Sequence, residues 1–191
     1  MELRVRQWEK LNYLDPERIL RGLRTIATSH ALHTLPYEVA SLRRRDLRVY
    51  GEGRQAALFC YAMSQVSGLR VAFAQAEASD YDIVARYARG DTAIYVPIQL
   101  KELVPAKVNS NADLQLELDK IAKYVDSHDL VVAFHLNTDR RIEFTSLRFP
   151  VGIVSELWFF GAAAPDQKKW VLVGDMLLGN WGLRDFEYPG A

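Results

Sequence analysis

Apolar residues recur every three or four positions in two stretches of the first third of the chain, and each stretch predicts an amphipathic helix. The first follows Asp15-Pro16, a helix opening with an acid at the cap and proline at the first helical position. The second follows Gly51-Glu52-Gly53, interpreted as punctuation just before the helix, and ends at Gly68. The stripes are Ile19, Leu20, Leu23 and Ile26, and then Ala56, Phe59, Cys60, Met63 and Val66.

Beyond Gly68 the pattern changes to that of strands. Gly90-Asp91 separates two of them and predicts a hairpin turn. A further helix and a nearly continuous apolar run follow, and such a run is typical of a buried central strand. The predicted strands are 69–74, 81–87, 92–100 and 130–136, and the helix is 113–126. From residue 52 to 136 the order is therefore helix, three strands, helix, strand.

Length and composition predict one α/β domain. The chain has 191 residues, 49% of them hydrophobic and 25% charged. We divide it into a helical N-terminal extension (1–50), a core (51–137) and a C-terminal part (138–191). That last part is apolar and rich in tryptophan, and it either completes the sheet or forms a separate lobe.

The same totals bear on location. No apolar stretch approaches the roughly 18 residues that a membrane span needs, and the N-terminus is polar. Cys60 is the only cysteine, which rules out an internal disulfide, and we expect it to pack in the core. These features predict a cytoplasmic protein without a membrane partner.

The charge is unevenly spread although its total is zero, a total that argues against the simplest picture of a nucleic-acid binder. Residues 1–54 hold eleven Arg and Lys against seven Asp and Glu. The excess peaks at Arg43, Arg44, Arg45 and Arg48. This run is either a grip for phosphates or a solvated helix face, and the sequence leaves both interpretations open.

Four polar residues fall at positions that the predicted elements bring together. Glu52 opens a helix, Asp82 begins a strand, and Gln99 and Lys101 share one face of the next strand because they are two residues apart. A hairpin between these strands would place Asp82 near Lys101. Two carboxylates, an amide oxygen and an ammonium suit hydrolysis of a phosphodiester with Mg²⁺.

This arrangement resembles the αβββαβ core of the PD-(D/E)xK (restriction-endonuclease-like) nuclease superfamily, in its Gln-x-Lys variant. The matching segments are Gly-Glu52-Gly-Arg-Gln-Ala-Ala, Ser-Asp-Tyr-Asp82-Ile-Val and Val-Pro-Ile-Gln99-Leu-Lys101-Glu, within residues 52–136. The resemblance implies a mixed central sheet flanked by helices. It also implies a metal-dependent endonuclease that acts on DNA, with RNA as the alternative substrate, and it is compatible with a homodimer.

The resemblance further implies a role for each residue. Asp82 would be the main ligand of Mg²⁺ or Mn²⁺, with the side-chain oxygen of Gln99 and the backbone carbonyl of Leu100 beside it. Lys101 would orient the attacking water and stabilise the developing charge. Glu52 would bind a second metal or hold the water network.

Other interpretations stay open. Asp80 competes with Asp82 for the ligand role, and Glu52 could simply be an acid favoured by the start of its helix. His30 and His33 are three residues apart but lack further ligands for a metal site. We expect Glu102 to face solvent and His135 to lie in the core. The Trp158-Phe159-Phe160 segment could be a stacking platform for bases, but its density of aromatic residues favours the core or a dimer interface. The alternative function is a catalytically inactive nuclease-fold protein that serves as a protein- or nucleic-acid-binding module.

Overall fold

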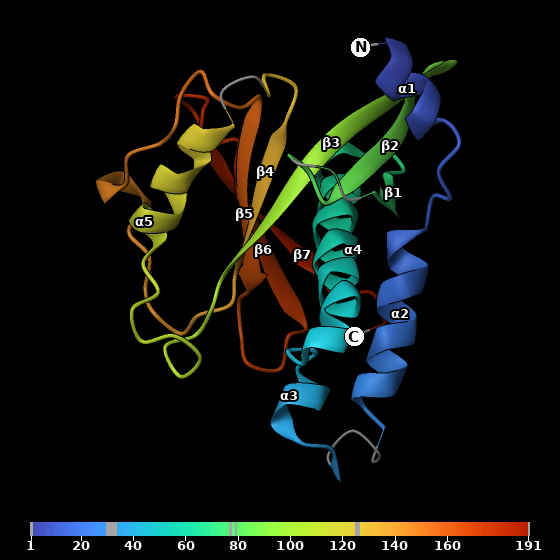
Figure 1. Cartoon of the computed structure of the whole chain (residues 1–191). Helices are drawn as coiled ribbons and strands as arrows, with labels where there is room; N and C mark the ends of the chain where they lie inside the picture. The colour runs from blue at the N-terminus through green and yellow to red at the C-terminus, as the bar shows by residue number, and fades with distance from the viewer. Residues whose placement is uncertain (1, 30–33, 77, 79, 125–126, 191) are drawn as a thin grey trace.

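One mixed sheet of seven strands forms the centre of the computed structural model, which describes residues 2–29, 34–76, 78, 80–124 and 127–190 (Figure 1). The strands lie in chain order from β1 to β7. The three middle strands, β3 to β5, are parallel, and the outer strands are antiparallel to their neighbours. The strands are β1 (Ala72–Gln75), β2 (Ile83–Arg89), β3 (Thr92–Leu103), β4 (Val131–Leu136), β5 (Glu156–Ala162), β6 (Lys169–Gly174) and β7 (Gly182–Glu187).

Helices cover both faces of this sheet. The two long helices α2 and α4 lie side by side on one face, and α5 lies on the other (Figure 1). The helices are α1 (Glu2–Trp8), α2 (Pro16–Ala27), α3 (Tyr37–Ala40), α4 (Arg48–Ser67) and α5 (Leu114–Asp119), with short 3-10 helices η2 (Arg45–Leu47), η3 (Lys120–Lys123) and η4 (Phe144–Ser146). None of the described helices is long and apolar enough to cross a membrane.

Two apolar clusters hold the layers together. One joins α2 and α4 to their face of the sheet, and it includes Leu20, Phe59, Ala133 and Trp170. The other joins α5 and η3 to the opposite face, and it includes Leu118, Ile121, Phe134 and Phe159. Burial of apolar area of this kind is the main force that fixes the helices on the sheet.

The last part of the chain extends this sheet, because β5 pairs with β4 and β6 and β7 follow. Phe159 and Phe160 of β5 are fully buried, as is Trp170 of β6. The core interpretation of the Trp158-Phe159-Phe160 segment therefore holds for its two phenylalanines, while Trp158 is half-buried.

The start of α4 differs from the prediction. The helix begins at Arg48, so Gly51, Glu52 and Gly53 lie inside it and Glu52 does not open it. Glycine inside a helix costs about 1 kcal/mol relative to alanine, and the sequence interpretation took these residues as a break. Both glycines have neighbours close by: a Cβ at Gly51 would meet the Leu42 carbonyl at 3.6 Å, and one at Gly53 would meet Gln75 Nε2 at 3.4 Å.

Other local signals were good guides. Asp15 caps α2 by accepting from the Arg18 N–H at 3.1 Å, and Asp113 caps α5 by accepting from the Leu116 N–H at 2.9 Å. Gly68 ends α4 with a left-handed φ of 69°. The helix predicted over 113–126 is shorter, however, since the chain tightens into the 3-10 helix η3 after Asp119.

Candidate functional site

Asp82 lies immediately before β2, opposite Gln99 of β3. Its N–H donates to the Ile98 carbonyl at 3.0 Å, and β2 then pairs from Ile83 onward. Its carboxylate oxygen Oδ2 accepts the backbone N–H of Leu100 at 2.8 Å and also accepts from the Gln99 side chain. The hairpin therefore brings Asp82, Gln99 and Leu100 into direct contact.

Both the nitrogen and the oxygen of the Gln99 side-chain amide have hydrogen-bond partners, and the residue is only 8% exposed. Its nitrogen Nε2 donates to Asp82 Oδ2 and to the Leu100 carbonyl, the latter at 3.2 Å. Its oxygen Oε1 accepts from the Tyr124 hydroxyl at 3.1 Å. The nitrogen, rather than the oxygen expected from the resemblance, thus faces Asp82, and two oxygen atoms converge on one donor.

Lys101 shares the face of Gln99 because side chains two residues apart on a strand point the same way. Its ammonium lies 5.8 Å from the centre of the Tyr124 ring. Lys123, at the end of η3, places a second ammonium 4.9 Å from the same ring centre. Tyr124 therefore lies beside three polar side chains, those of Gln99, Lys101 and Lys123.

Glu52 lies in the second turn of α4, where its carboxylate accepts from Arg48 Nε at 2.8 Å. The Glu52 side chain is 22% exposed, whereas that of Arg48 is 80% exposed. This i,i+4 pair occupies the carboxylate that was expected to bind a second metal or a water network.

The electrostatics of Asp82 connect these residues. Burial raises the pKa of its carboxyl above the ordinary value. The Leu100 hydrogen bond opposes this rise, the charge of Glu52 adds to it, and the charges of Lys101 and Arg48 lower the pKa again. Asp82 is thus a carboxylate whose negative charge its surroundings compensate only in part.

Asp80, the competing candidate, points elsewhere: its carboxylate accepts from the Ser127 hydroxyl at 3.4 Å. Of the two acids, it is Asp82 that contacts the Gln99 side chain and the Leu100 backbone. The two acids are both within electrostatic reach of Tyr124, whose pKa burial raises.

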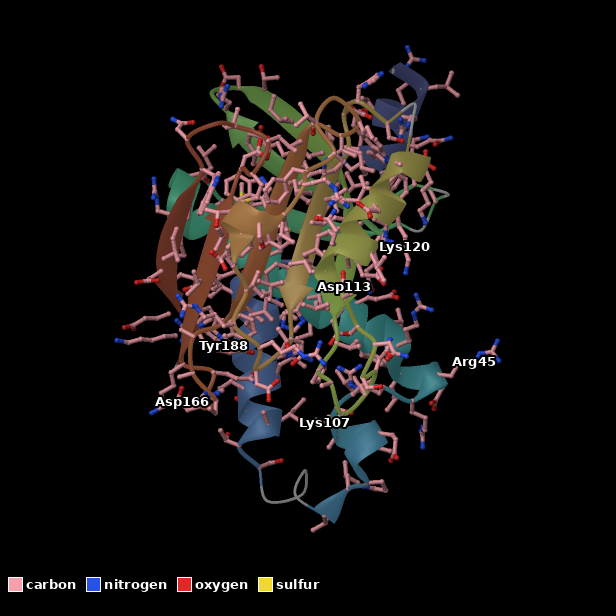
Figure 2. All side chains as sticks on the ribbon, turned by 90° about the vertical axis from the view of Figure 1, so that its left-hand side faces the viewer. Arg45, Lys107, Asp113, Lys120, Asp166 and Tyr188 are labelled. Atoms are coloured by element: carbon pink, nitrogen blue, oxygen red, sulfur yellow. The ribbon has the colours of Figure 1, made fainter. Side chains whose placement is uncertain are left out.

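The arginine run is not a helix face, because Arg43 and Arg44 precede η2 in a loop. Three of its four members form ion pairs with acidic residues: Arg43 with Glu102 at 2.8 Å, Arg44 with Asp46 at 2.7 Å and Arg48 with Glu52 at 2.8 Å. Arg45 projects outward from the protein (Figure 2). Among the four arginines, Arg45 alone is exposed and makes no ion pair with an acidic side chain of the described residues.

Glu102 was expected to face solvent, and this expectation is wrong. Its side chain is 22% exposed, and its carboxylate accepts from Arg43, from Asn137 Nδ2 at 2.7 Å and from Gln55 Nε2 at 3.4 Å. It lies on the opposite face of β3 from Lys101, next to the first turns of α4. These bonds tie the loop before α4 and the end of β4 to the central strand.

Within the described residues, no group of three or more His, Cys, Asp or Glu side chains could hold a metal ion. A cation site at Asp82 would instead draw on an amide and a backbone carbonyl. His30 and His33 lie outside the residues that the structure describes. His135 is buried as expected, and burial lowers its pKa to about 3. Cys60 is also buried, which raises its pKa.

Sequence reasoning missed Tyr124 and Lys123. Tyr124 follows η3 and is 4% exposed, so its only sequence signal was an aromatic residue near the end of an apolar helical stripe. Nothing local in the sequence pairs residue 124 with residue 99. Their contact depends on where η3 packs against β3.

No protein-family model, curated protein or solved structure matches this chain.

Proposed function

We propose that this protein is a metal-dependent phosphodiester hydrolase, an endonuclease that acts on DNA through a restriction-endonuclease-like core of the PD-(D/E)xK type. The order α4, β1, β2, β3, α5, β4 around a mixed sheet supports this proposal. The observation that carries it is the convergence of Asp82 Oδ2 and the Leu100 carbonyl on one point, with Lys101 on the same strand face.

The residues present fit a hard divalent cation. Asp82 Oδ2 and the Leu100 carbonyl are both oxygen atoms, the ligands that Mg²⁺ prefers, and they meet at the Gln99 nitrogen. A half-turn of the amide would present Oε1 in place of Nε2. The Tyr124 hydroxyl would then accept from the nitrogen, since a phenol both donates and accepts hydrogen bonds. The buried, partly compensated charge of Asp82 also favours a cation.

In this proposal each side chain has a stated task. A bound Mg²⁺ or Mn²⁺ supplies polarisation of the scissile phosphate and a more acidic water. Asp82, Gln99 and the Leu100 carbonyl hold that cation. Lys101 stabilises the negative charge that develops on the phosphate and orients the attacking water. Glu52 would hold part of the water network, with its Oε1 already accepting from Arg48.

The proposal is tested by nicking of supercoiled DNA in Mg²⁺, Mn²⁺ or EDTA. Wild type should cleave in either metal and not in EDTA. Asp82→Ala should lose at least about a hundredfold in rate, because removing one group that stabilises the transition state costs at least that much. Asp80→Ala is the matched control, and its cleavage rate should stay close to that of wild type. Metal-independent cleavage, or equal rates for Asp82→Ala and wild type, would contradict the assignment.

A specific observation favours a second candidate, a catalytically inactive nuclease-fold protein that binds a protein or nucleic acid. Internal partners already occupy the polar groups of the cluster: Gln99 bonds Asp82 and Tyr124, and Glu52 bonds Arg48. Such a closed network needs no metal to be stable. Absence of cleavage in every metal, together with no Mn²⁺ binding by calorimetry, would favour this candidate.

A further inference from the structure

The Tyr124 ring holds two ammonium groups beside the proposed catalytic cluster. Lys101 reaches it from β3 and Lys123 from the end of η3, at 5.8 and 4.9 Å from the ring centre. A cation near the face of an aromatic ring is attracted to the negative charge of that face. This attraction restricts a lysine side chain that would otherwise sample many rotamers.

The ring itself is fixed. Tyr124 is 4% exposed and packs in the apolar cluster between η3 and the sheet. Its hydroxyl donates to Gln99, the residue that contacts Asp82. Lys123 is therefore placed relative to Asp82 and Gln99 through a short series of defined contacts, although its own side chain is exposed.

Two ammonium groups around Tyr124 offer contacts to an anion, beside the carboxylates of Asp80 and Asp82. Within the described residues, no carboxylate forms an ion pair with Lys101 or Lys123. Lys120, one turn before Lys123, differs in that its ammonium pairs with Glu117 at 2.6 Å. The Lys123 ammonium is thus a positive charge that Tyr124 holds in place, exposed to solvent, beside Asp82 and Gln99.

We propose that Lys123 is a second phosphate-contacting residue of this site, binding a non-bridging oxygen of a nucleic-acid backbone that passes over η3 beside Lys101. The inference rests on the proposed nuclease function and adds to it a path for the strand. Because a lysine–phosphate contact is electrostatic and carries no base information, Lys123 contributes to affinity and not to sequence preference.

Fluorescence anisotropy with a labelled DNA duplex in EDTA, over a series of NaCl concentrations, tests this contact. Lys123→Ala should bind about three- to fivefold more weakly, and the slope of log K against log [NaCl] should fall by about 0.9. Lys123→Arg should retain the slope of wild type. Lys169→Ala is the control for loss of one charge, and it should bind like wild type. Lys169 is exposed at the start of β6, which lies three strands away from β3 in the sheet.

The results separate this inference from the function on which it rests. If wild type cleaves DNA in Mg²⁺ but Lys123→Ala keeps the wild-type affinity and salt slope, the contact is overturned and the nuclease stands. An equal loss for Lys169→Ala and Lys123→Ala would also overturn it, since the effect would then come from net charge. If wild type neither binds nor cleaves nucleic acid, both the function and the contact are overturned.

Discussion

The side-chain amide of Gln99 donates to the carboxylate of Asp82 across the antiparallel pair of β2 and β3. The same nitrogen donates to the Leu100 carbonyl, so a single neutral donor satisfies two oxygen atoms at once. In the proposed metal site, a cation bound by Asp82 and the Leu100 carbonyl would take the position of this amide nitrogen. A glutamate at position 99 could not satisfy the two oxygen atoms, because a carboxylate has no N–H to donate.

Gln99→Glu should therefore destabilise the protein in EDTA and strengthen metal binding. The variant places two carboxylates in contact, and loss of a buried donor costs about 1–3 kcal/mol. A charged oxygen ligand should raise Mn²⁺ affinity about tenfold relative to the neutral amide, corresponding to about 1.4 kcal/mol. Urea unfolding and calorimetry measure the two effects.

Gln115→Glu is the matched control for this variant. Gln115 Nε2 donates to Asp119 Oδ1 at 2.7 Å, an exposed Gln–Asp contact on α5 away from the cluster. The same change of charge there should leave Mn²⁺ affinity unaltered. A Gln99→Glu protein that is as stable in EDTA as wild type would contradict the proposal that the Gln99 amide nitrogen satisfies Asp82 and the Leu100 carbonyl in place of a cation.

Asp82→Asn should stabilise the metal-free protein at neutral pH. Burial raises the pKa of Asp82 in the folded protein. The protonated carboxyl therefore adds to the free energy of unfolding below the pKa of the unfolded chain, and this contribution is lost as pH rises through the folded pKa. Ionised Asp82 consequently opposes folding, and both hydrogen bonds reach Oδ2, which an asparagine oxygen can replace. We expect a gain of about 0.5–2 kcal/mol in EDTA, typical of such substitutions at functional sites.

Thermal unfolding with and without Mn²⁺ checks the Asp82→Asn variant. Wild type should gain stability on addition of the metal, whereas the asparagine variant should gain little because its main charged ligand is missing. A lower unfolding temperature than wild type in EDTA would show that the carboxylate supports the fold.

Arg43→Ala should lower the stability of the protein, whereas Arg45→Ala should weaken DNA binding. Arg43 bonds the half-buried Glu102, and its removal should cost about 1–3 kcal/mol of unfolding free energy by leaving that carboxylate short of a partner. Arg45 is exposed, so its removal should change stability by less than about 0.5 kcal/mol and should weaken DNA binding instead. Urea unfolding and anisotropy on both variants test this division, and a DNA-binding loss confined to Arg43→Ala would reverse it.

Stability should fall with acid because of His135. Burial is the main cause of its low pKa of about 3, and the charges of Arg54 and Arg43 lower the pKa further. A histidine whose pKa is lowered by folding stabilises the protein fully above its unfolded pKa of about 6.5. This stabilisation is lost as pH falls toward the folded pKa, at up to about 1.4 kcal/mol per pH unit. His135→Phe, with a ring of similar size between Phe160 and Trp170, should flatten this dependence between pH 6 and 4. An unchanged pH profile would exclude His135 as its source.

Local patterns predicted much of this protein. The hairpin at Gly90, the cap at Asp15 and the apolar run of β4 each depend on neighbours in the sequence, and each was found. The contact of Asp82 with Gln99 follows from the same logic, because a tight turn fixes the register of two adjacent strands.

Contacts between distant segments were beyond such patterns. Glycines inside α4 were taken as a break, because the neighbours that close around Gly51 and Gly53 are known only from the fold. Glu102 was expected in solvent, since its partners Arg43 and Asn137 come from separate loops. Tyr124 was missed for the same reason, although it supports both Gln99 and Lys101.

Single-turnover cleavage of duplex DNA in Mg²⁺ by Asp82→Ala, Lys101→Ala and the double variant tests most directly whether these residues act as one catalytic site. Residues that act as a unit give losses that do not multiply, so the double variant should be about as slow as the slower single variant. Wild-type rates in either single variant, or losses that multiply in the double variant, would contradict a shared site. Absence of cleavage by wild type in any metal would contradict the nuclease itself.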